Sequence, residues 1–434
     1  MMRVLWCLLA VSVAANSAQA QLRLPVAPLP PLPLQRLTQT VGQTGANALD
    51  QLSEVRHLQI AGLIRANPRS IAADPHGNPV VRDELLAFSA TAQAIDAAQA
   101  RGFRLMREQT VGELDFHLAV LQPPPHMSIA KALRWLREAD PAGAYDYNHI
   151  YMGVGAVAEK LAPQPIQNRT AASEEAGGTL RPLPRVGLVD AGVEVSHPVF
   201  HDAIIHTWGC NEHLIASTHG TAVASLLVGQ APPFHGVLVK AELYAADVYC
   251  NAPTGGAVDA LAAAFAWLAQ QRVAVINVSL VGPDNAALAQ IVRALTAHGF
   301  LLVAAVGNDG PAAPPLYPAS YPNVVGVTAV DAHRRVLIEA AHGKQVMFAA
   351  PGADMAAADM GGKYVSVRGT SFAAPIVAAL LAQTLHKPDP GSSGAAIDSL
   401  SRSAIDLGPP GHDLTYGFGL VGADYRTDPA ELRR

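Results

Sequence analysis

Charged side chains are scarce in this sequence, and neither sign dominates. Its 434 residues include 30 lysines and arginines against 35 aspartates and glutamates, which leaves a formal net charge of -5. A protein that binds nucleic acid or an anionic membrane surface usually carries a basic patch, and this balance offers none. We therefore expect no nucleic-acid partner. Half of the residues are hydrophobic, which at this length provides for a large globular core.

Long hydrophobic runs are absent after residue 20. Residues 1–20 contain Arg3, an apolar run over residues 4–15 and the small-residue ending AQA at residues 18–20, which is the layout of a secretory signal peptide. The apolar run is too short to span a bilayer, and no later segment is long and uninterrupted enough. The sequence thus predicts an exported protein without a membrane anchor, in the periplasm or outside the cell.

Cysteine is also scarce. Cys7 lies in the predicted signal peptide, and only Cys210 and Cys250 follow it. Because no cysteine comes just after the predicted cleavage site, we expect no lipid anchor there. An even number of cysteines in an exported domain favours a disulfide over two free thiols, so we expect Cys210 to pair with Cys250. Closing a loop of about 40 residues is worth about 3 to 4 kcal/mol in the chain-entropy model.

Two stretches rich in proline and glycine divide the chain. Residues 21–48 begin with alternating proline and leucine, and they predict a linker without a core of its own. Residues 153–184 contain several prolines and glycines, and they predict a second linker or exposed loop.

The segment between the linkers, residues 49–152, predicts a small α+β unit. Its expected elements are a leucine-rich helix from Leu49 to Leu63, a turn at 75–79, a helix from Thr91 to Ala100, a strand pair from Phe103 to Leu121, a helix from Ser128 to Arg137 capped by Ser128, and a strand from Tyr145 to Met152. The unit has no cluster of catalytic-type side chains, so we expect it to pack or to bind.

From residue 185 to residue 425 the pattern changes to buried strands that alternate with helices. Nearly continuous apolar runs of strand length occupy residues 186–189, 240–248, 273–280, 300–306 and 324–330. The clearest helix follows Pro283, with Asp284 as its expected cap and Gly299 as its stop. This alternation predicts an α/β fold with a doubly wound parallel sheet, whose reacting groups gather at the carboxyl ends of the strands. Residues 426–434 form a tail.

Four polar residues stand at strand ends or helix starts of this segment: Asp190, His219, Asn308 and Ser371. Each has an ordinary structural explanation by itself, as a turn aspartate, a packed or capping histidine, a loop asparagine and an N-cap serine. Together they comprise what acyl transfer needs: a nucleophile, a base to take its proton, an acid to hold the base, and an amide donor for the oxyanion.

The motifs around these residues resemble the subtilase family of serine proteases. They are VDAGV at Asp190, HGTAVASLLVG from His219, VINVSL from Val275, AAVGNDGP around Asn308, YPASYPNVVGVTAVD from Tyr317, APG from Ala350 and GTSFAAPIVAALLA from Gly369. The order Asp, His, Ser along the chain is also the order in subtilisin. The resemblance implies a subtilisin-like fold and a serine endopeptidase that acts on protein or peptide substrates.

Carried over onto this chain, the resemblance implies a role for each matching residue. Ser371 would be the nucleophile, His219 the general base and then acid, and Asp190 the group that orients His219. Asn308 would hold the oxyanion together with the backbone N–H of Ser371. The stretch Ser279, Leu280, Val281 and Gly282 would bind substrate backbone, and Val281 stands where the family often has glycine, which predicts added bulk beside the cleft.

Residues 49–152 resemble the family's inhibitory propeptide by pattern and position. This implies that the chain's own N-terminal unit is an intramolecular inhibitor and folding helper, cut away at a site within residues 153–184. Many relatives bind calcium, but no run of acidic and amide side chains identifies a calcium site here. No other cofactor is implied.

Two other functions are weighed beside this one. The first is a metal-dependent hydrolase that uses the histidines from His197 to His219. It is suggested by the spacing of His197 and His201, which would place both side chains on one face of a helix. The absence of an HExxH pattern and the presence of Pro198 argue against it. The second is a secreted binding protein on a protease scaffold that no longer catalyses. It is disfavoured because all four candidate positions are intact.

Overall fold

The structure is a computed structural model that describes residues 45–153, 155–161 and 183–433. The predicted signal peptide, most of the first linker and residues 162–182 of the second lie outside the described residues. No helix among the described residues combines the length and the apolar character needed to cross a bilayer.

A seven-stranded parallel sheet forms the centre of the C-terminal segment. Its strand order is β17-β16-β15-β13-β8-β12-β9, and every neighbouring pair is parallel. The strands are β8 (Arg185–Asp190), β9 (Ile204–Trp208), β12 (Glu242–Asp247), β13 (Val275–Val278), β15 (Leu301–Ala305), β16 (Val325–Val330) and β17 (Val346–Pro351). The predicted doubly wound α/β fold is therefore confirmed.

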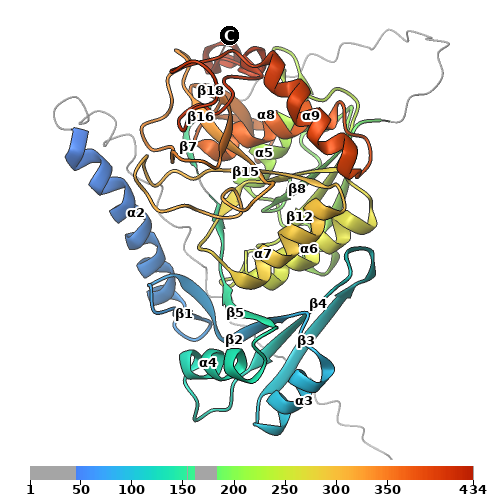
Figure 1. Cartoon of the computed structure of the whole chain (residues 1–434). Coiled ribbons are helices and arrows are strands. Elements are labelled where there is room, and N and C mark those ends of the chain that lie inside the picture. Colours follow the sequence, from blue (N-terminus) through green and yellow to red (C-terminus); the bar gives the residue numbers. More distant parts are fainter. Residues whose placement is uncertain (1–44, 154, 162–182, 434) are drawn as a thin grey trace, which may run out of the picture. The chain divides into compact units, whose positions relative to one another are not determined.

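Helices cover both faces of this sheet (Figure 1). Leu188 and Val303 point into the same apolar cluster as α5 (Thr218–Val228) and α8 (Thr370–Ala382). Their sequence neighbours Val189 and Leu302 point into the cluster with α6 (Val258–Gln270) and α7 (Ala286–Ala297). Successive strand residues face opposite sides, so continuous apolar strands supply both cores at once. Helix α9 (Pro390–Ser403) contacts α8.

Helix α7 begins one residue later than the sequence predicts. Its cap is Asn285, whose side chain accepts a hydrogen bond from the N–H of Leu288 at 3.0 Å, so the expected cap Asp284 is wrong. Gly299 follows the last turn with φ +84°, and the expected stop there is confirmed.

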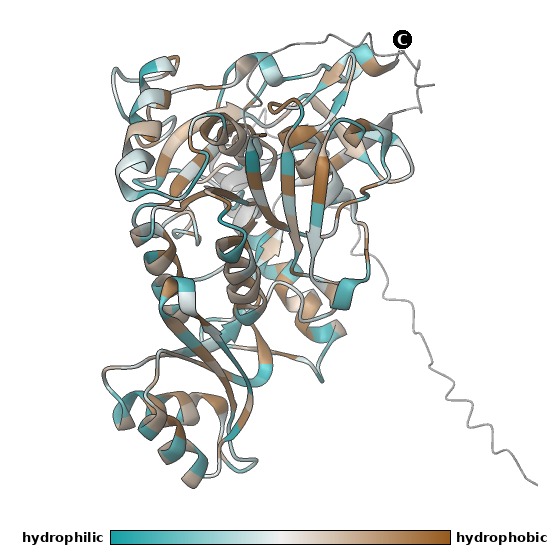
Figure 2. Cartoon of the chain, turned by 90° about the vertical axis from the view of Figure 1, so that its right-hand side faces the viewer, coloured by the Kyte–Doolittle hydropathy of each residue, from teal (hydrophilic) through white to brown (hydrophobic). Residues whose placement is uncertain are grey.

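The N-terminal unit is a five-stranded antiparallel sheet with helices. Its elements are α2 (Gly45–Ala66), β1 (Ile71–Ala73), β2 (Pro79–Phe88), α3 (Ala92–Ala100), β3 (Arg104–Val111), β4 (Phe116–Gln122), α4 (Ile129–Ala139) and β5 (Ala144–His149). Thr91 caps α3, whereas Ser128 stands at the cap position of α4 without a capping side-chain bond. Hydrophilic and hydrophobic residues alternate along many of the strands in Figure 2.

The two faces of this N-terminal sheet meet different partners. Leu85 and Leu121 pack with Leu133 of α4. The neighbouring residue Leu86 instead shares a cluster with Phe265 of α6. The sheet is therefore buried on both sides, once by its own helix and once by the helices of the parallel-sheet unit.

Several short strands were not expected from the sequence. The predicted strand from 145 to 152 ends at His149, and β6 (Met152–Gly153) pairs separately with β14 (Leu280–Val281). Within the predicted second linker, β7 (Ala156–Leu161) pairs with β19 (Lys363–Arg368), which also pairs with β18 (Met355–Asp359). A small hairpin joins β10 (Gln230–Ala231) to β11 (Phe234–His235). Short 3-10 helices occupy Gly112–Leu114, Pro198–Phe200, Cys210–Glu212, Ala423–Tyr425 and Pro429–Arg433.

Replacement of Phe265 tests the shared core. Phe265→Ala, made in a Ser371→Ala background that removes the expected nucleophile, should lower the free energy of unfolding by about 3 to 5 kcal/mol because it leaves a cavity at a fully buried site. Urea unfolding followed by circular dichroism measures the loss. Gln270→Ala, on the exposed side of the same helix, is the matched control and should change stability by less than about 0.5 kcal/mol. Equal effects of the two changes would contradict this assignment of the core.

Candidate active site

Asp190 and His219 meet at the carboxyl end of β8. Asp190 is the last residue of that strand and is almost fully buried, and His219 is the second residue of α5. The Nδ1 atom of His219 lies 2.7 Å from Oδ1 of Asp190. A carboxylate at this distance keeps a proton on Nδ1, so that Nε2, on the other side of the ring, is the atom able to accept one.

A glycine makes this approach possible. A Cβ atom on Gly220 would lie 2.1 Å from the carbonyl oxygen of Ala191, the residue after Asp190. Any side chain at position 220 would therefore push α5 away from the end of β8. The dipeptide His219-Gly220 is required for a histidine to reach this aspartate.

Ser371 is the second residue of α8 and is fully buried. The rings of His219 and of Phe372, the residue after Ser371, lie 5.4 Å apart between centroids. The first turns of α5 and α8 therefore face each other, and the structure brings the candidate base and the candidate nucleophile to one place.

Ser279 holds the start of α8 through two reciprocal hydrogen bonds. The hydroxyl of Ser371 donates to the carbonyl of Ser279 at 3.2 Å, and the hydroxyl of Ser279 donates to the carbonyl of Ser371 at 2.9 Å. The second bond has a cause in the sequence. Pro375 is the sixth residue of α8 and has no N–H, so the carbonyl four residues earlier, that of Ser371, lacks its helical donor. The Ser279 hydroxyl replaces it, and Asn277 Nδ2 donates to that hydroxyl at 2.9 Å.

Asn308 lies beside the start of the same helix. Its Oδ1 accepts hydrogen bonds from the N–H of Thr370 at 3.1 Å and from the hydroxyl of Thr370 at 3.0 Å. Because both partners are donors, the atom that they contact is the oxygen Oδ1, and Nδ2 is the other terminal atom of the same planar amide group. A Cβ atom on Gly369, whose φ is +138°, would lie 2.7 Å from that Nδ2. Glycine at position 369 thus allows an amide donor to lie next to Ser371, as an oxyanion site requires.

The expected substrate-binding stretch pairs with the chain's own β6. Leu280 is opposite Gly153 and Val281 is opposite Met152 in an antiparallel arrangement. Gly282 continues the stretch by exchanging two backbone hydrogen bonds with Tyr317, at 2.9 and 3.0 Å. Val281, expected to add bulk beside the cleft, is fully buried and belongs to the core cluster of α8.

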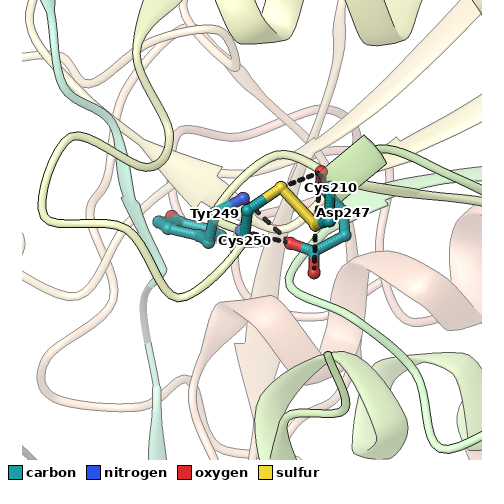
Figure 3. The surroundings of a disulfide bond; sticks show 4 residues. All are labelled: Cys210, Asp247, Tyr249 and Cys250. Carbon is teal, nitrogen blue, oxygen red and sulfur yellow. Dashed lines mark hydrogen bonds between the residues drawn. A yellow bond between two sulfur atoms is a disulfide. The ribbon is translucent and has the colours of Figure 1, made fainter. Parts of the chain in front are cut away.

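A disulfide joins Cys210 to Cys250 beside this site (Figure 3). Asp247, the last residue of β12, accepts hydrogen bonds from the N–H groups of Tyr249 and Cys250, each at 2.9 Å. Burial raises the pKa of the Asp247 carboxyl above its usual value. Asp247 is paired in register with Asp190 on the neighbouring strand, so the disulfide ties down the loop next to the candidate orienting acid.

The histidines proposed as a metal cluster have separate partners. His197 is buried, and its Nε2 lies 3.0 Å from the carbonyl of Lys363. His206 stacks on the ring of Tyr244, and His201 lies 3.2 Å from Asp202. In the described part of the chain, the one group of residues with metal-ligand spacing is Cys210, Asp247 and Cys250, and its two sulfurs form the disulfide.

Comparison with known proteins agrees with this geometry. The profile of the subtilase family matches residues 184–419. The chain belongs to the subtilase family. Subtilisin DY from Bacillus licheniformis is 31% identical over 248 residues, which are 55% of this chain and 89% of that protein. Subtilisin Savinase from Lederbergia lenta is 34% identical over 212 residues, 48% of this chain and 77% of that protein.

Two further similarities concern longer proteins. Minor extracellular protease Epr from Bacillus subtilis (strain 168) is 29% identical over 245 residues, which are 55% of this chain but only 37% of that protein. The crystal structure of fervidolysin from Fervidobacterium pennivorans, a keratinolytic enzyme related to subtilisin, has a TM-score of 0.63 at 19% identity and covers 82% of this subtilase and 61% of that chain. The similarity to fervidolysin supports the fold alone.

The sequence did not reveal the part played by the Ser279 side chain. The stretch from 279 to 282 was expected to bind substrate backbone. The structure adds that the Ser279 hydroxyl donates a hydrogen bond to the carbonyl of Ser371. A usable signal was present, because a proline four residues after a serine removes the helical donor of that serine's carbonyl.

Ser279→Ala should lower kcat for peptide hydrolysis by about tenfold, because the buried carbonyl of Ser371 loses its donor and the start of α8 is less firmly held. KM should change little, since the backbone of β14 remains. Ser393→Ala is the matched control: Ser393 is a buried serine of α9 whose hydroxyl donates to the carbonyl of Gly299 and not to that of Ser371. A kcat loss of the same size in both variants would mean that the effect is one of stability and not of positioning.

Proposed function

We propose that this subtilase is an exported serine endopeptidase that hydrolyses peptide bonds through Asp190, His219 and Ser371. The observation that carries the proposal is the 2.7 Å contact between Asp190 and His219, at the end of the sheet where the start of α8 presents Ser371. Export to the periplasm or the cell exterior is supported by the signal-like residues 1–20, which lie outside the described residues.

In this mechanism Ser371 Oγ attacks the substrate carbonyl while His219 Nε2 takes its proton. Asp190 stabilises the imidazolium that forms. The negative charge on the carbonyl oxygen is held by Asn308 Nδ2 and by the N–H of Ser371, at the positive end of α8. His219 then gives its proton to the leaving amine, which leaves an acyl group on Ser371. Water, activated by the same histidine, releases the acid and restores the serine.

Replacement of the two central residues should give a clear ranking. Ser371→Ala should reduce kcat by about six orders of magnitude, and Asn308→Ala by about 10² to 10³, which are the losses measured for the corresponding changes in subtilisin. Hydrolysis of a fluorogenic peptide by purified protein measures both.

An inhibitor test separates the proposal from metal-dependent hydrolysis. A serine-directed phosphonate should abolish activity, whereas a chelator should not remove the chemistry. Full activity of Ser371→Ala, or inhibition by the chelator alone, would contradict the proposed nucleophile. An inert but folded wild-type protein would favour the binding-protein alternative.

We further propose that the N-terminal unit, residues 49–152, inhibits the protease as a propeptide and is cut away by Ser371 itself. Support comes from the place where this unit ends. Strand β6 pairs with β14 as a substrate would, and a Cβ atom on Gly153 would lie 3.8 Å from the ring of His219. Two residues later, a Cβ atom on Gly155 would lie 2.7 Å from the ring of Phe372. Gly153 therefore lies beside His219, and Gly155 lies beside the start of α8.

Hydrogen bonds between the N-terminal unit and helices α6 and α7 support a tight complex of this unit with the protease. Asn285, the cap of α7, donates through Nδ2 to the carbonyl of Tyr147 at 2.8 Å, and the N–H of Ala286 donates to Asp146 at 2.7 Å. A carboxylate at a helix start is favoured by the helix dipole. Arg107 Nε lies 2.8 Å from Asp259 of α6. Because the unit is tethered, even modest affinity would silence the enzyme until the chain is cut.

Expression of wild type beside Ser371→Ala tests self-processing. The wild type should yield a shorter band whose new N-terminus is residue 154 or 155, and Ser371→Ala should remain full length. N-terminal sequencing and intact mass measure the cut. If both proteins stay uncut while the wild type digests peptides, the unit is a permanent accessory domain.

A further inference from the structure

Asp359 lies beside the start of α5, the helix that carries His219. It is the last residue of β18, and it is only 4% exposed. Its Oδ1 atom accepts a hydrogen bond from the hydroxyl of Thr218 at 2.6 Å. Thr218 is the first residue of α5 and directly precedes His219. The candidate base therefore follows a residue whose side chain is held by a carboxylate from a distant part of the chain.

The hairpin of β18 and β19 holds this carboxylate in place. Strand β18 contacts α5, and the N–H of Ala358 donates to the hydroxyl of Ser225 on that helix at 3.0 Å. In the turn of the hairpin, the N–H of Gly361 donates to the carboxylate of Glu194 at 2.7 Å. The N–H of Glu194 in turn donates to the hydroxyl of Thr221 on α5 at 3.0 Å. The hairpin is thus fastened to α5 at several points, which gives its side chains a defined position beside the helix.

The place of His219 in α5 is unfavourable for its protonated form. The start of an α-helix carries a partial positive charge, and His219 is the second residue of this helix. The proposed mechanism nevertheless requires an imidazolium when the ring takes the proton of Ser371. Asp190 supplies one compensating carboxylate, 2.7 Å from the ring. Asp359 supplies a second one at the same end of the helix, where Thr218 holds it.

Other titratable groups occupy different places around this helix start. Asp247 on β12 is in register with Asp190, and burial raises the pKa of its carboxyl above its usual value. Burial, together with the charge of Asp190, raises the pKa of the Tyr249 hydroxyl. Lys363 is opposite Asp359 in the hairpin. The neighbours that α8 and β6 place beside the imidazole are a phenyl ring and a glycine, which carry no charge.

We infer that Asp359 is a positioning residue that orients His219 through Thr218 and favours the protonated form of that histidine during peptide hydrolysis. The inference rests on the proposed proteolytic function. The hydrogen bond fixes the first residue of α5 against β18, and hence the backbone from which the imidazole projects. The negative charge offsets the helix dipole as the imidazolium forms. Asp190 contacts the ring itself, whereas Asp359 acts through the preceding residue.

Asp359→Asn tests the charge, because an asparagine oxygen can still accept the hydrogen bond of Thr218. With a fluorogenic peptide, kcat should fall about two- to fivefold, since the imidazolium loses a favourable charge at the helix start. The pH at which kcat/KM falls to half on the acid side should move lower by about 0.2 to 0.7 units. The sign follows from the same cause: without the anion, His219 binds a proton less readily and stays in its neutral, active form to lower pH.

Ser225→Ala is the matched control for a merely structural effect. It removes another hydrogen bond between the same helix and the same strand, that from Ala358, but it removes no charge. This variant should have a lower melting temperature and the acid half-point of wild type. An Asp359→Asn enzyme with the wild-type half-point, or an equal shift in Ser225→Ala, would overturn the inference while the proposed function stands. No Ser371-dependent hydrolysis by wild type would overturn both.

Thr218 decides the matter if Asp359→Asn does not fold. Thr218→Val removes the hydroxyl at nearly constant volume, whereas Thr218→Ser retains it. The kcat of Thr218→Val should be about two- to tenfold below that of Thr218→Ser, because only the serine can donate to Asp359. Equal kcat values in the two folded variants would refute the inference.

Discussion

Burial of α8 is the constraint on which the site depends. Almost every residue of this helix from Thr370 to Ala382 is buried, and it contacts α5 and five strands of the parallel sheet. A helix enclosed on all sides has one position in which its side chains fit, so its first turn is held as firmly as the core. Ser371 therefore has a defined place relative to His219 on α5 and Asn308 after β15. The reciprocal bonds with Ser279 complete this support where Pro375 interrupts the helix's own hydrogen bonding.

Backbone hydrogen bonding joins β14 to the N-terminal unit. Strand β14 offers an edge that β6 occupies, and the contacts of such an edge are made by main-chain atoms. Under the proposed function, the same main-chain atoms would hold the extended backbone of a substrate. Asp309, the residue after Asn308, forms an ion pair with Arg56 of the N-terminal unit, which also supplies β6.

Much of the architecture could be predicted because parallel strands buried on both faces are continuous apolar runs. The edge strand β9 was missed for the opposite reason, since it is partly exposed and its sequence IIHTW contains histidine and threonine. The cap of α7 was misplaced by one residue because Asp284 and Asn285 are both good caps, and the hydrogen bond from Asn285 to the Tyr147 carbonyl is a tertiary contact that local sequence does not reveal. Strand β7 was taken for linker because its pairing with β19 depends on a strand some two hundred residues later.

By itself the sequence determined the fold class, the family and the identity of the four candidate reacting residues, because each of these can be recognised from patterns among neighbouring residues. Apolar periodicity, glycines at His219-Gly220 and Gly369, and motif order all act over a few neighbouring residues. Only the tertiary structure decided which atoms meet. The link from Ser279 to Ser371, the approach of Gly153 to His219, and the pairing of Arg56 with Asp309 join segments separated by up to some 250 residues. Such contacts depend on how the sheet and helices pack, and no local pattern encodes their geometry.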